Sequence, residues 1–394
     1  MKKRLFSLLL AVSLVLGMIV MPAGAAVAGQ TYETCPHCGL AWDQVNWQAL
    51  LVEEPDKTIP SGHYYLEEDL TMSKRYKIGT SDGQTADLAE DVCLDLRGYK
   101  IQPKGSNDRA FYIYNFSRFD VLDSVGGGQV VGNNTGIGGS MYVCKDAHFY
   151  LHSGTVSNGK ANHTANGGVI YGSTGSNIHI YGGIVDGSEV TFGEDVAAKN
   201  ARGGAIYVGG SLEITDGLIL GGTANQGGAI SVASAGTMRM SGGIVAGGTA
   251  KNTGGNINSF GDVYISGGQI IGGFSSAKGG NIYSAYNTDG LLADLYISGG
   301  IIADGTASSS GGNVAVEKGT CEISGGTIKG NFYTTVGITI TGKPVINNFD
   351  YEGMQSSAVV TFKDLTEGAS VLLMGGSSEV TVASQNLRLS RRLD

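Results

Sequence analysis

The stretch LYISGGIIADGTASSSGGNVAVEKGTCEISGGTIKGN, residues 295–331, decides the fold because it states one pattern twice. Alternating apolar and polar residues lead into a glycine doublet, and two or three apolar, mostly β-branched residues follow it. Alternation of this kind is typical of a strand with one buried face, and a glycine doublet indicates a sharp turn. The stretch therefore predicts short strands that meet at tight corners.

The same unit recurs along most of the chain, with aligned glycines separated by 25 to 34 residues. These glycines are Gly98, Gly128, Gly154, Gly183, Gly217, Gly243, Gly268, Gly300 and Gly326. Each unit carries three short apolar patterns, and strands that bury only one face become stable when copies stack and share a core. We therefore expect an all-β chain folded as a three-sided parallel β-helix of about nine coils, with an N-terminal cap.

Composition and charge narrow the class of protein. The chain has 65 glycines, six prolines and 41% apolar residues, which favours a packed repeat fold over a disordered linker. Its formal net charge of -9 argues against nucleic acid as a partner. Five cysteines in a chain of this length do not form the dense disulfide framework of small secreted domains.

The chain begins with Lys2, Lys3 and Arg4, continues with apolar residues to Met21, and then has small residues. This pattern predicts a secretory signal peptide over residues 1–28, with an uncleaved membrane anchor as the alternative. The expected location is secreted, extracellular or on the cell surface, and the expected membrane contact is through the signal before its cleavage. After it we expect an N-terminal cap with a CPHC motif (29–90), β-helix repeats (91–346) and C-terminal strands (347–394).

Several segments carry a resemblance to a known family: GHYYLEEDL from Gly62, VCLDLRGYKI, FDVLDSVGGGQVVGNN, the ISGG units, VINNFDYEG and FKDLTEGASVLL. The chain resembles the secreted right-handed parallel β-helix proteins of Gram-positive gut anaerobes, within the pectin-lyase-like superfamily. The resemblance implies a right-handed coil. It leaves the function open, because that superfamily contains polysaccharide lyases and hydrolases as well as non-catalytic surface proteins.

Tyrosines occupy two columns of outward positions. Tyr150, Tyr264 and Tyr296 lie on the first strand of their coils, and Tyr142, Tyr171 and Tyr207 lie on the third. Tyrosines one coil apart on a flat face can stack on sugar rings, which predicts a glycan-binding surface. The alternative is that the rings support one another across neighbouring strands.

The first column also contains His179, Glu213 and Arg239, which form the alternative catalytic set. The lyases of the family pair a calcium-binding aspartate cluster with a basic residue on one sheet, and this mixed column departs from that pattern. The longest insertion carries Asp186, Glu189, Glu194 and Asp195. These carboxylates predict a calcium site or an acid pair, with a solvated acidic loop as the ordinary alternative.

Cys35 and Cys38 form a CxxC pair that can give two thiolates to zinc, and His37 or His63 can add a nitrogen. A half-site or a local disulfide is the alternative, because a structural zinc site needs four ligands and the chain has no second CxxC. Cys321 is expected in the core. Cys93 and Cys144 are expected at outward positions, with no partner assigned. The column Asn256, Asn281 and Asn313 is expected to be structural, with side-chain amides bonded along the stack.

The sequence thus predicts a non-catalytic secreted or cell-surface β-helix that binds glycan or acts as an adhesin, with an extracellular glycan or a surface protein as partner. The alternative is a polysaccharide lyase or glycoside hydrolase that acts on extracellular polysaccharide. A purely structural spacer is the third possibility. No cofactor is expected beyond zinc at the CxxC pair or calcium at the acidic insertion.

Overall fold

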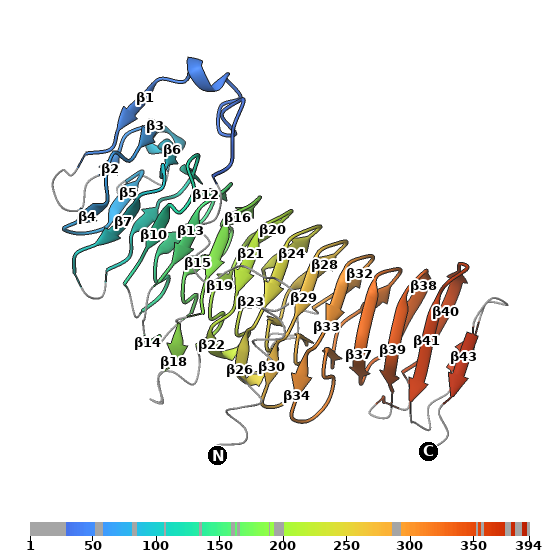
Figure 1. Cartoon of the computed structure of the whole chain (residues 1–394). Helices are drawn as coiled ribbons and strands as arrows, with labels where there is room; N and C mark the ends of the chain where they lie inside the picture. Colours follow the sequence, from blue (N-terminus) through green and yellow to red (C-terminus); the bar gives the residue numbers. More distant parts are fainter. Residues whose placement is uncertain are drawn as a thin grey trace.

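The computed structural model describes residues 29–51, 58–80, 85–105, 108–133, 136–158, 162–163, 166–188, 190–192, 201–285, 293–351, 354–355, 358–374, 380–382 and 388–391. In these ranges the chain forms short β-strands and two 3-10 turns, η1 (Trp42–Gln44) and η2 (Ala86–Leu88). The strands follow one another along a rod, so that the colours of Figure 1 run from blue to red along its length. Nothing in this part of the chain is a helix long and apolar enough to cross a membrane.

One side of the rod, the first face, is a 14-stranded sheet. Its strands are β1 (Trp47–Ala49), β3 (Gly62–Tyr65), β6 (Asp91–Asp95), β9 (Arg118–Leu122), β12 (His148–Leu151), β16 (Asn177–Ile180) and β20 (Ser211–Ile214). It continues with β24 (Thr237–Met240), β28 (Asp262–Ile265), β32 (Leu295–Ile297), β36 (Cys321–Ile323), β38 (Ile338–Gly342), β40 (Val360–Leu365) and β42 (Val380–Val382).

The other two sides of the rod belong to a 23-stranded sheet. The second face contains β4 (Leu70–Met72), β7 (Lys100–Pro103), β10 (Gln129–Val131), β13 (Thr155–Ser157), β17 (Ile184–Asp186), β21 (Leu218–Leu220), β25 (Ile244–Ala246), β29 (Gln269–Ile271) and β33 (Ile301–Ala303). The third face contains β2 (Thr58–Ile59), β5 (Tyr76–Ile78), β8 (Phe111–Ile113), β11 (Met141–Val143), β15 (Ile170–Gly172), β19 (Ile206–Val208), β23 (Ile230–Val232), β27 (Ile257–Ser259), β31 (Ile282–Ser284) and β35 (Val314–Val316).

The second and third faces merge at β37 (Thr327–Thr334). The start of this eight-residue strand pairs with β33 and its end pairs with β35. Three further strands continue the merged face: β39 (Val345–Asp350), β41 (Ser370–Met374) and β43 (Arg388–Arg391). Beyond β37 the described rod therefore has two sides instead of three.

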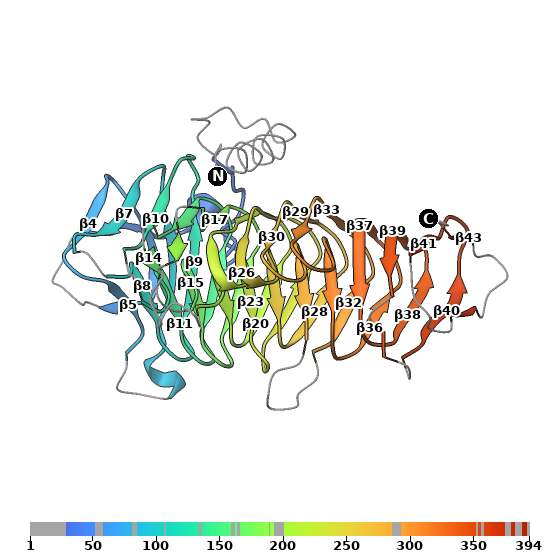
Figure 2. The same cartoon turned by 90° about the horizontal axis from the view of Figure 1, so that it is seen from below.

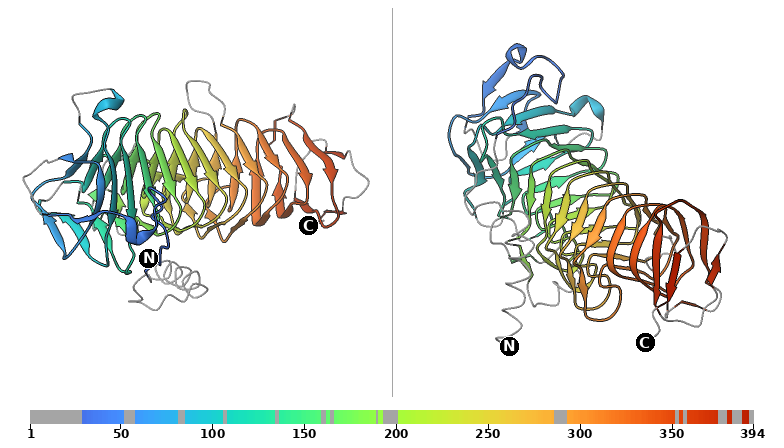
Figure 3. Two further views of the ribbon diagram at one scale, coloured as in Figure 1. Left: turned by 90° about the horizontal axis from the view of Figure 1, so that it is seen from above. Right: turned by 45° about the vertical axis from the view of Figure 1, so that its right-hand side comes forward.

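Two small sheets lie in the loops between the second and third faces. One pairs β14 (Asn162–His163) with β18 (Thr191–Phe192). The other contains β22 (Thr223–Gln226), β26 (Thr249–Thr253), β30 (Phe274–Ser275) and β34 (Thr306–Ala307). Figures 2 and 3 show the stacked coils from below and from above.

Every named strand pairs in parallel with the equivalent strand of a neighbouring coil, for example Met238 with Val263 and Met240 with Ile265. The parallel β-helix predicted from the repeat is therefore confirmed. The stack also extends past the predicted repeats at both ends. Strands β1 to β5 pair within the same faces before residue 91, and β40 to β43 continue them after residue 346.

One continuous core fills the inside of the rod, as the alternating pattern predicts. Phe149, Ile178, Leu212, Met238 and Val263 lie one above another on the inner side of the first face, and each is at most 1% exposed. Because a strand turns successive side chains to opposite faces, this inner column fixes an outer column beside it.

The aligned glycines turn the chain between strands, and all of them except Gly128 have a positive φ. Gly243 shows why no side chain fits there. Its φ is 74°, and a Cβ at this position would lie 2.8 Å from the Gly217 carbonyl oxygen of the preceding coil. Both the backbone conformation and the close approach of the neighbouring coil require glycine.

The asparagine column is a buried ladder of side-chain amides, as predicted. Asn256 Nδ2 donates to Asn281 Oδ1 (2.7 Å), and Asn281 Nδ2 donates to Asn313 Oδ1 (2.7 Å). Each Oδ1 also accepts a backbone N–H of its own coil, from Gly248, Gly273 and Gly305, respectively. The ladder thus satisfies backbone groups at a corner where no strand partner reaches them.

Candidate functional site

The outer surface of the first face displays one central side chain per strand in a straight row. Parallel pairing places these residues in direct register, as for His63 with Cys93 and Tyr150 with His179. We call this set the outer row: Trp47, His63, Cys93, Asp120, Tyr150, His179, Glu213, Arg239, Tyr264, Tyr296 and Glu322. Neighbours in the row are about 4.8 Å apart along the rod.

Residues 29–45, here called the N-terminal strap, cover the beginning of the outer row. The Gln30 N–H donates to the Asp123 carbonyl (3.4 Å), and the Tyr32 hydroxyl hydrogen-bonds to Ser153 Oγ (2.8 Å). Figure 1 shows this dark blue segment beside the first coils. As a result Cys93, which the sequence places on the outside of its strand, is completely buried.

Three possible metal ligands meet under the strap. The thiols of Cys35 and Cys93 and a ring nitrogen of His63 all lie within 4.8 Å of one another. Cys35 belongs to the strap, whereas His63 and Cys93 lie on β3 and β6. A hydrogen bond from Cys93, aided by N–H groups of Cys38 and His37, lowers the pKa of Cys35 to about 4. Cys38 lies three residues after Cys35, but its thiol is exposed and lies outside this group of three.

His37 and His63 were both predicted as possible zinc ligands, and their hydrogen-bond environments show which of them is free to bind a metal. His37 Nδ1 donates to Asp120 Oδ2 (2.9 Å), and its Nε2 lies 3.3 Å from Asp91 Oδ1. His63 Nε2, in contrast, is buried and has no hydrogen-bond partner in the described part of the chain. The nitrogens of His37 thus both face carboxylates, and His63 remains as the nitrogen ligand.

Asp120 holds several segments together beside this group. Its carboxylate accepts hydrogen bonds from Arg118 Nε (2.7 Å), His37 Nδ1 (2.9 Å) and His152 Nε2 (2.8 Å). Burial alone would raise the pKa of Asp120, but these three donors outweigh it and hold the pKa well below its usual range. Asp120 is therefore a buried carboxylate that anchors both the strap and the first face.

The outer row emerges from under the strap at Tyr150 and His179, whose rings stack at 4.3 Å. The Arg118 guanidinium lies 4.5 Å from the other side of this stack, at the Tyr150 ring centre. His179 Nδ1 donates to Glu213 Oε2 (3.0 Å), and the Tyr181 hydroxyl donates to the same oxygen (3.1 Å). Tyr181 is 38% exposed on this face and was not among the site residues predicted from the sequence.

Arg239 follows Glu213 in the row but takes part in a different contact. Its guanidinium lies 4.1 Å from the Tyr264 ring centre, and the Tyr264 and Tyr296 rings are parallel at 4.9 Å. No ion pair joins Arg239 to Glu213 among the described residues. The alternative catalytic set is thus adjacent in space, but only His179 and Glu213 interact in it.

The second predicted tyrosine column lies on the third face. Tyr142 packs against Tyr171 at 4.9 Å, Tyr171 is parallel to Tyr207 at 5.1 Å, and Tyr112 extends the stack at 4.6 Å from Tyr142. Burial raises the pKa of Tyr171 to about 12. Because the ring faces lie against one another, this column presents ring edges to solvent, as cross-strand support requires.

The acidic insertion lies largely outside the described residues, which include Asp186 but not Glu189, Glu194 or Asp195. Asp186 Oδ1 accepts hydrogen bonds from the Ser188 N–H (2.9 Å) and the Ser188 hydroxyl (2.6 Å). Asp186 therefore serves a local turn in the structure. The predicted signal, residues 1–28, also lies outside the described residues.

All five cysteines are free thiols, and Cys321 is buried in the core as expected.

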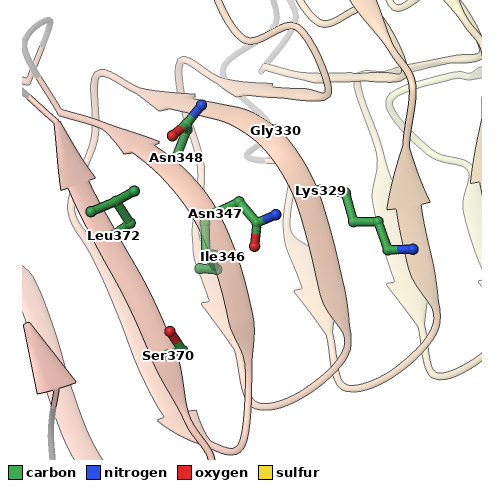
Figure 4. A pocket seen from close by; sticks show the side chains of 7 residues that line it. All are labelled: Lys329, Gly330, Ile346, Asn347, Asn348, Ser370 and Leu372. Carbon is green, nitrogen blue, oxygen red and sulfur yellow. The ribbon is translucent and has the colours of Figure 1, made fainter. Parts of the chain in front are cut away.

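A hollow lies away from the outer row, over β37, β39 and β41 (Figure 4). It is lined by Lys329, Gly330, Ile346, Asn347, Asn348, Ser370 and Leu372, none of which was predicted from the sequence as a site residue.

Comparisons of the chain with protein-family models, with curated proteins and with solved structures find no match.

Proposed function

We propose that this protein is a secreted or cell-surface, non-catalytic β-helix of the pectin-lyase-like type, and that it binds an extracellular glycan. The binding surface in this proposal is the open part of the outer row, from His179 to Glu322. One observation carries the proposal: charged, hydrogen-bonding side chains flank a stacked tyrosine pair there, in register, on a face that the strap leaves uncovered.

The open row offers what an extended sugar chain requires. Glu213 and Glu322 provide acceptors for hydroxyl groups, and Arg239 provides donors. They are spaced by whole numbers of coils, about 4.8 Å each, so a linear ligand along the rod meets them in turn. The stacked pair Tyr264 and Tyr296 lies between them and supplies apolar surface with polar edges.

The six predicted tyrosines differ in how much ring surface they can offer. Tyr150 is enclosed by Arg118 and His179, and Tyr264 by Arg239 and Tyr296. A sugar can therefore contact the edges of these rings but not their faces. Tyr296 has an aromatic neighbour on one side only, since the next residue of the row is Glu322. We assign the main aromatic contact to Tyr296.

Within the outer row, the positions of the two glutamates favour binding over hydrolysis. Glycoside hydrolases place two carboxyl groups about 5 to 10 Å apart, whereas Glu213 and Glu322 are four coils apart, about 19 Å. The His179–Glu213 pair resembles half of an acid–base arrangement, but His179 Nε2 is buried and does not face the open surface. The lyase or hydrolase alternative therefore has less support.

The proposal is tested by screening the purified protein on a glycan array and measuring affinity for any positive glycan by calorimetry. Tyr296→Ala is expected to weaken binding by about 2- to 10-fold, the value of one aromatic contact. The matched control is Tyr171→Ala on the third face, which should leave binding unchanged. Absence of binding across a broad panel, or equal losses in the two variants, contradicts the proposal.

The same panel distinguishes the enzymatic alternative. Polysaccharides incubated with the protein are assayed for new reducing ends and for unsaturated sugars. Release of either product, abolished by Glu213→Gln, would establish a hydrolase or lyase in place of a binding protein. Unchanged polysaccharide together with measurable binding supports the non-catalytic function.

A further inference from the structure

The cluster under the N-terminal strap is independent of the glycan surface and has its own chemistry. It brings together residues from three separate segments: the strap, β3 and β6. Two of them, His63 and Cys93, are register partners on adjacent strands, so the fold places their side chains side by side. The third, Cys35, is carried onto them by the strap. Two soft thiol ligands and an imidazole therefore converge at one buried point.

The spacing of these atoms fits a tetrahedral metal. Ligands at the usual zinc–sulfur distance of about 2.3 Å lie about 3.8 Å from one another at the corners of a tetrahedron. The three ligand atoms are all within 4.8 Å of one another, so small side-chain adjustments suffice to reach that geometry. Cys38 lies three residues after Cys35 in the same turn, and its thiol is exposed outside the group of three.

A second, independent observation points to a ligand at this place. His63 Nε2 is buried without a hydrogen-bond partner in the described part of the chain, which is unfavourable for a polar atom. Around it, the rings of Trp47 and His37 approach His63 edge-on at 5.4 and 5.0 Å and leave its nitrogen unpaired. Coordination to a metal would satisfy this nitrogen.

We propose that this cluster is a structural zinc centre that fastens the N-terminal strap to the first face. Three of its ligands are the clustered Cys35, His63 and Cys93, and we assign Cys38 as the fourth, whose exposed thiol must turn inward to reach the metal. Three thiolates and one imidazole are a typical donor set for structural Zn²⁺, and four protein ligands leave no open position for catalysis. His37 is not a ligand but supports the centre, because it ties the same turn to Asp120.

The centre gives the strap a defined role. The strap contains one 3-10 turn and an isolated antiparallel bridge between Thr34 and Ala41, so its own backbone pairing is sparse. A metal that joins Cys35 and Cys38 to β3 and β6 would link folding of the strap to folding of the first coils. Removal of the metal should then release the strap and expose Cys93.

The test measures metal binding directly in the purified, fully reduced protein. Native mass spectrometry and elemental analysis should find one zinc per chain. Replacement by Co²⁺ should give the thiolate-to-metal charge-transfer bands and the intense visible bands of a tetrahedral site. Because this is measured on the unaltered protein, the result does not depend on whether a variant folds.

Variants then assign the ligands. Cys93→Ser and His63→Ala should each weaken zinc binding by more than about 100-fold, since loss of a supporting residue alone costs 10- to 100-fold. The matched control Cys321→Val, a core cysteine outside the centre, should bind zinc as the wild type does. His37→Asn, which removes a supporting residue, should lose only about 10- to 100-fold in zinc affinity. In the wild type, a chelator should increase proteolysis within residues 29–45.

Three results would overturn the proposal. The first is the absence of stoichiometric zinc in the reduced protein. The second is unchanged affinity in Cys93→Ser, which would leave only the CxxC half-site. The third is a disulfide between Cys35 and Cys38 or Cys93 in the secreted protein that re-forms in preference to zinc binding after reduction. None of these results bears on glycan binding, which is measured on a different surface.

Discussion

Replacement of Asn281 by alanine tests whether the buried amide ladder holds the coils together. Asn281 Oδ1 accepts hydrogen bonds from Asn256 Nδ2 (2.7 Å) and the Gly273 N–H (2.9 Å). Its Nδ2 donates to the Ala303 carbonyl (2.7 Å) and to Asn313 Oδ1 (2.7 Å). Asn281 is fully buried, so water does not replace these partners without a rearrangement of the corner.

The expected cost follows from the groups that lose every partner. The Ala303 carbonyl keeps the Gly272 N–H (3.2 Å), and Asn313 Oδ1 keeps its own backbone donor. Two N–H groups are left unpaired: that of Gly273 and one of the two on Asn256 Nδ2. At about 1 to 3 kcal/mol for each buried unpaired group, Asn281→Ala should destabilise this region by about 2 to 6 kcal/mol.

Asn256→Ala is the matched comparison, because it leaves only the Gly248 N–H unpaired. Its cost should be about half, 1 to 3 kcal/mol. The exposed residue Asn252 supplies the control, and Asn252→Ala should change stability by less than about 0.5 kcal/mol.

Hydrogen exchange followed by mass spectrometry is the suitable assay, since long repeat arrays need not unfold in a single step. In Asn281→Ala, amides near Gly273 should exchange at least about 30-fold faster than in the wild type, which corresponds to 2 kcal/mol. The reasoning is refuted if Asn281→Ala has no larger effect than Asn256→Ala, or if either matches Asn252→Ala.

Three further predictions concern corners, charge and ring stacking. Gly243→Ala should lower the thermal midpoint more than Gly247→Ala. The φ angles of the two glycines are nearly equal, 74° and 73°, but only at Gly243 would the added Cβ have a neighbouring backbone oxygen within 3 Å. Equal shifts of the midpoint would rule out the close-approach explanation. Glu317 accepts a hydrogen bond from Lys278, and despite burial this holds the pKa of Glu317 below its usual value. The stabilisation from the Glu317–Lys278 interaction is present above the unfolded pKa of Glu317 and is lost as the pH falls through the folded pKa. In urea titrations between about pH 5 and 3, the wild type should therefore lose more stability than Glu317→Gln. Parallel losses in the two proteins would contradict this. Tyr171→Ser removes two ring contacts, with Tyr142 and Tyr207, and should lower the free energy of unfolding by about 0.4 to 2 kcal/mol in the same titrations. Glycan affinity should not change. An unchanged free energy of unfolding would argue against a supporting role for the tyrosines of the third face.

The sequence was sufficient to predict the features that every coil repeats. Inner columns such as Leu212 and Met238, the corner at Gly243 and the amide of Asn281 all follow from local patterns that recur at one position per coil. Register then places the predicted His179 and Glu213 side by side, because parallel stacking preserves position within the repeat.

What the sequence did not predict depends on a segment outside the repeat. Cys93 was assigned to an outward position without a partner, whereas the strap covers it and brings Cys35 to it. Part of the site could have been found from the sequence, because alignment of GHYY with VCLD places His63 beside Cys93. The repeat also did not predict how the rings are oriented. It showed that Tyr171 and Tyr207 occupy equivalent positions, but not that their ring faces pack together.

The change from three sides to two at β37 affects how copies of the rod can meet. A strand edge can template pairing with another chain, and end-to-end joining of identical rods would produce fibres. The described coils near β3 have three separate faces, whereas those near β41 have a first face and one merged face. The two described cross-sections differ, so in an end-to-end stack the first faces could pair, but the separate second and third faces of one rod would meet a single merged face of the next.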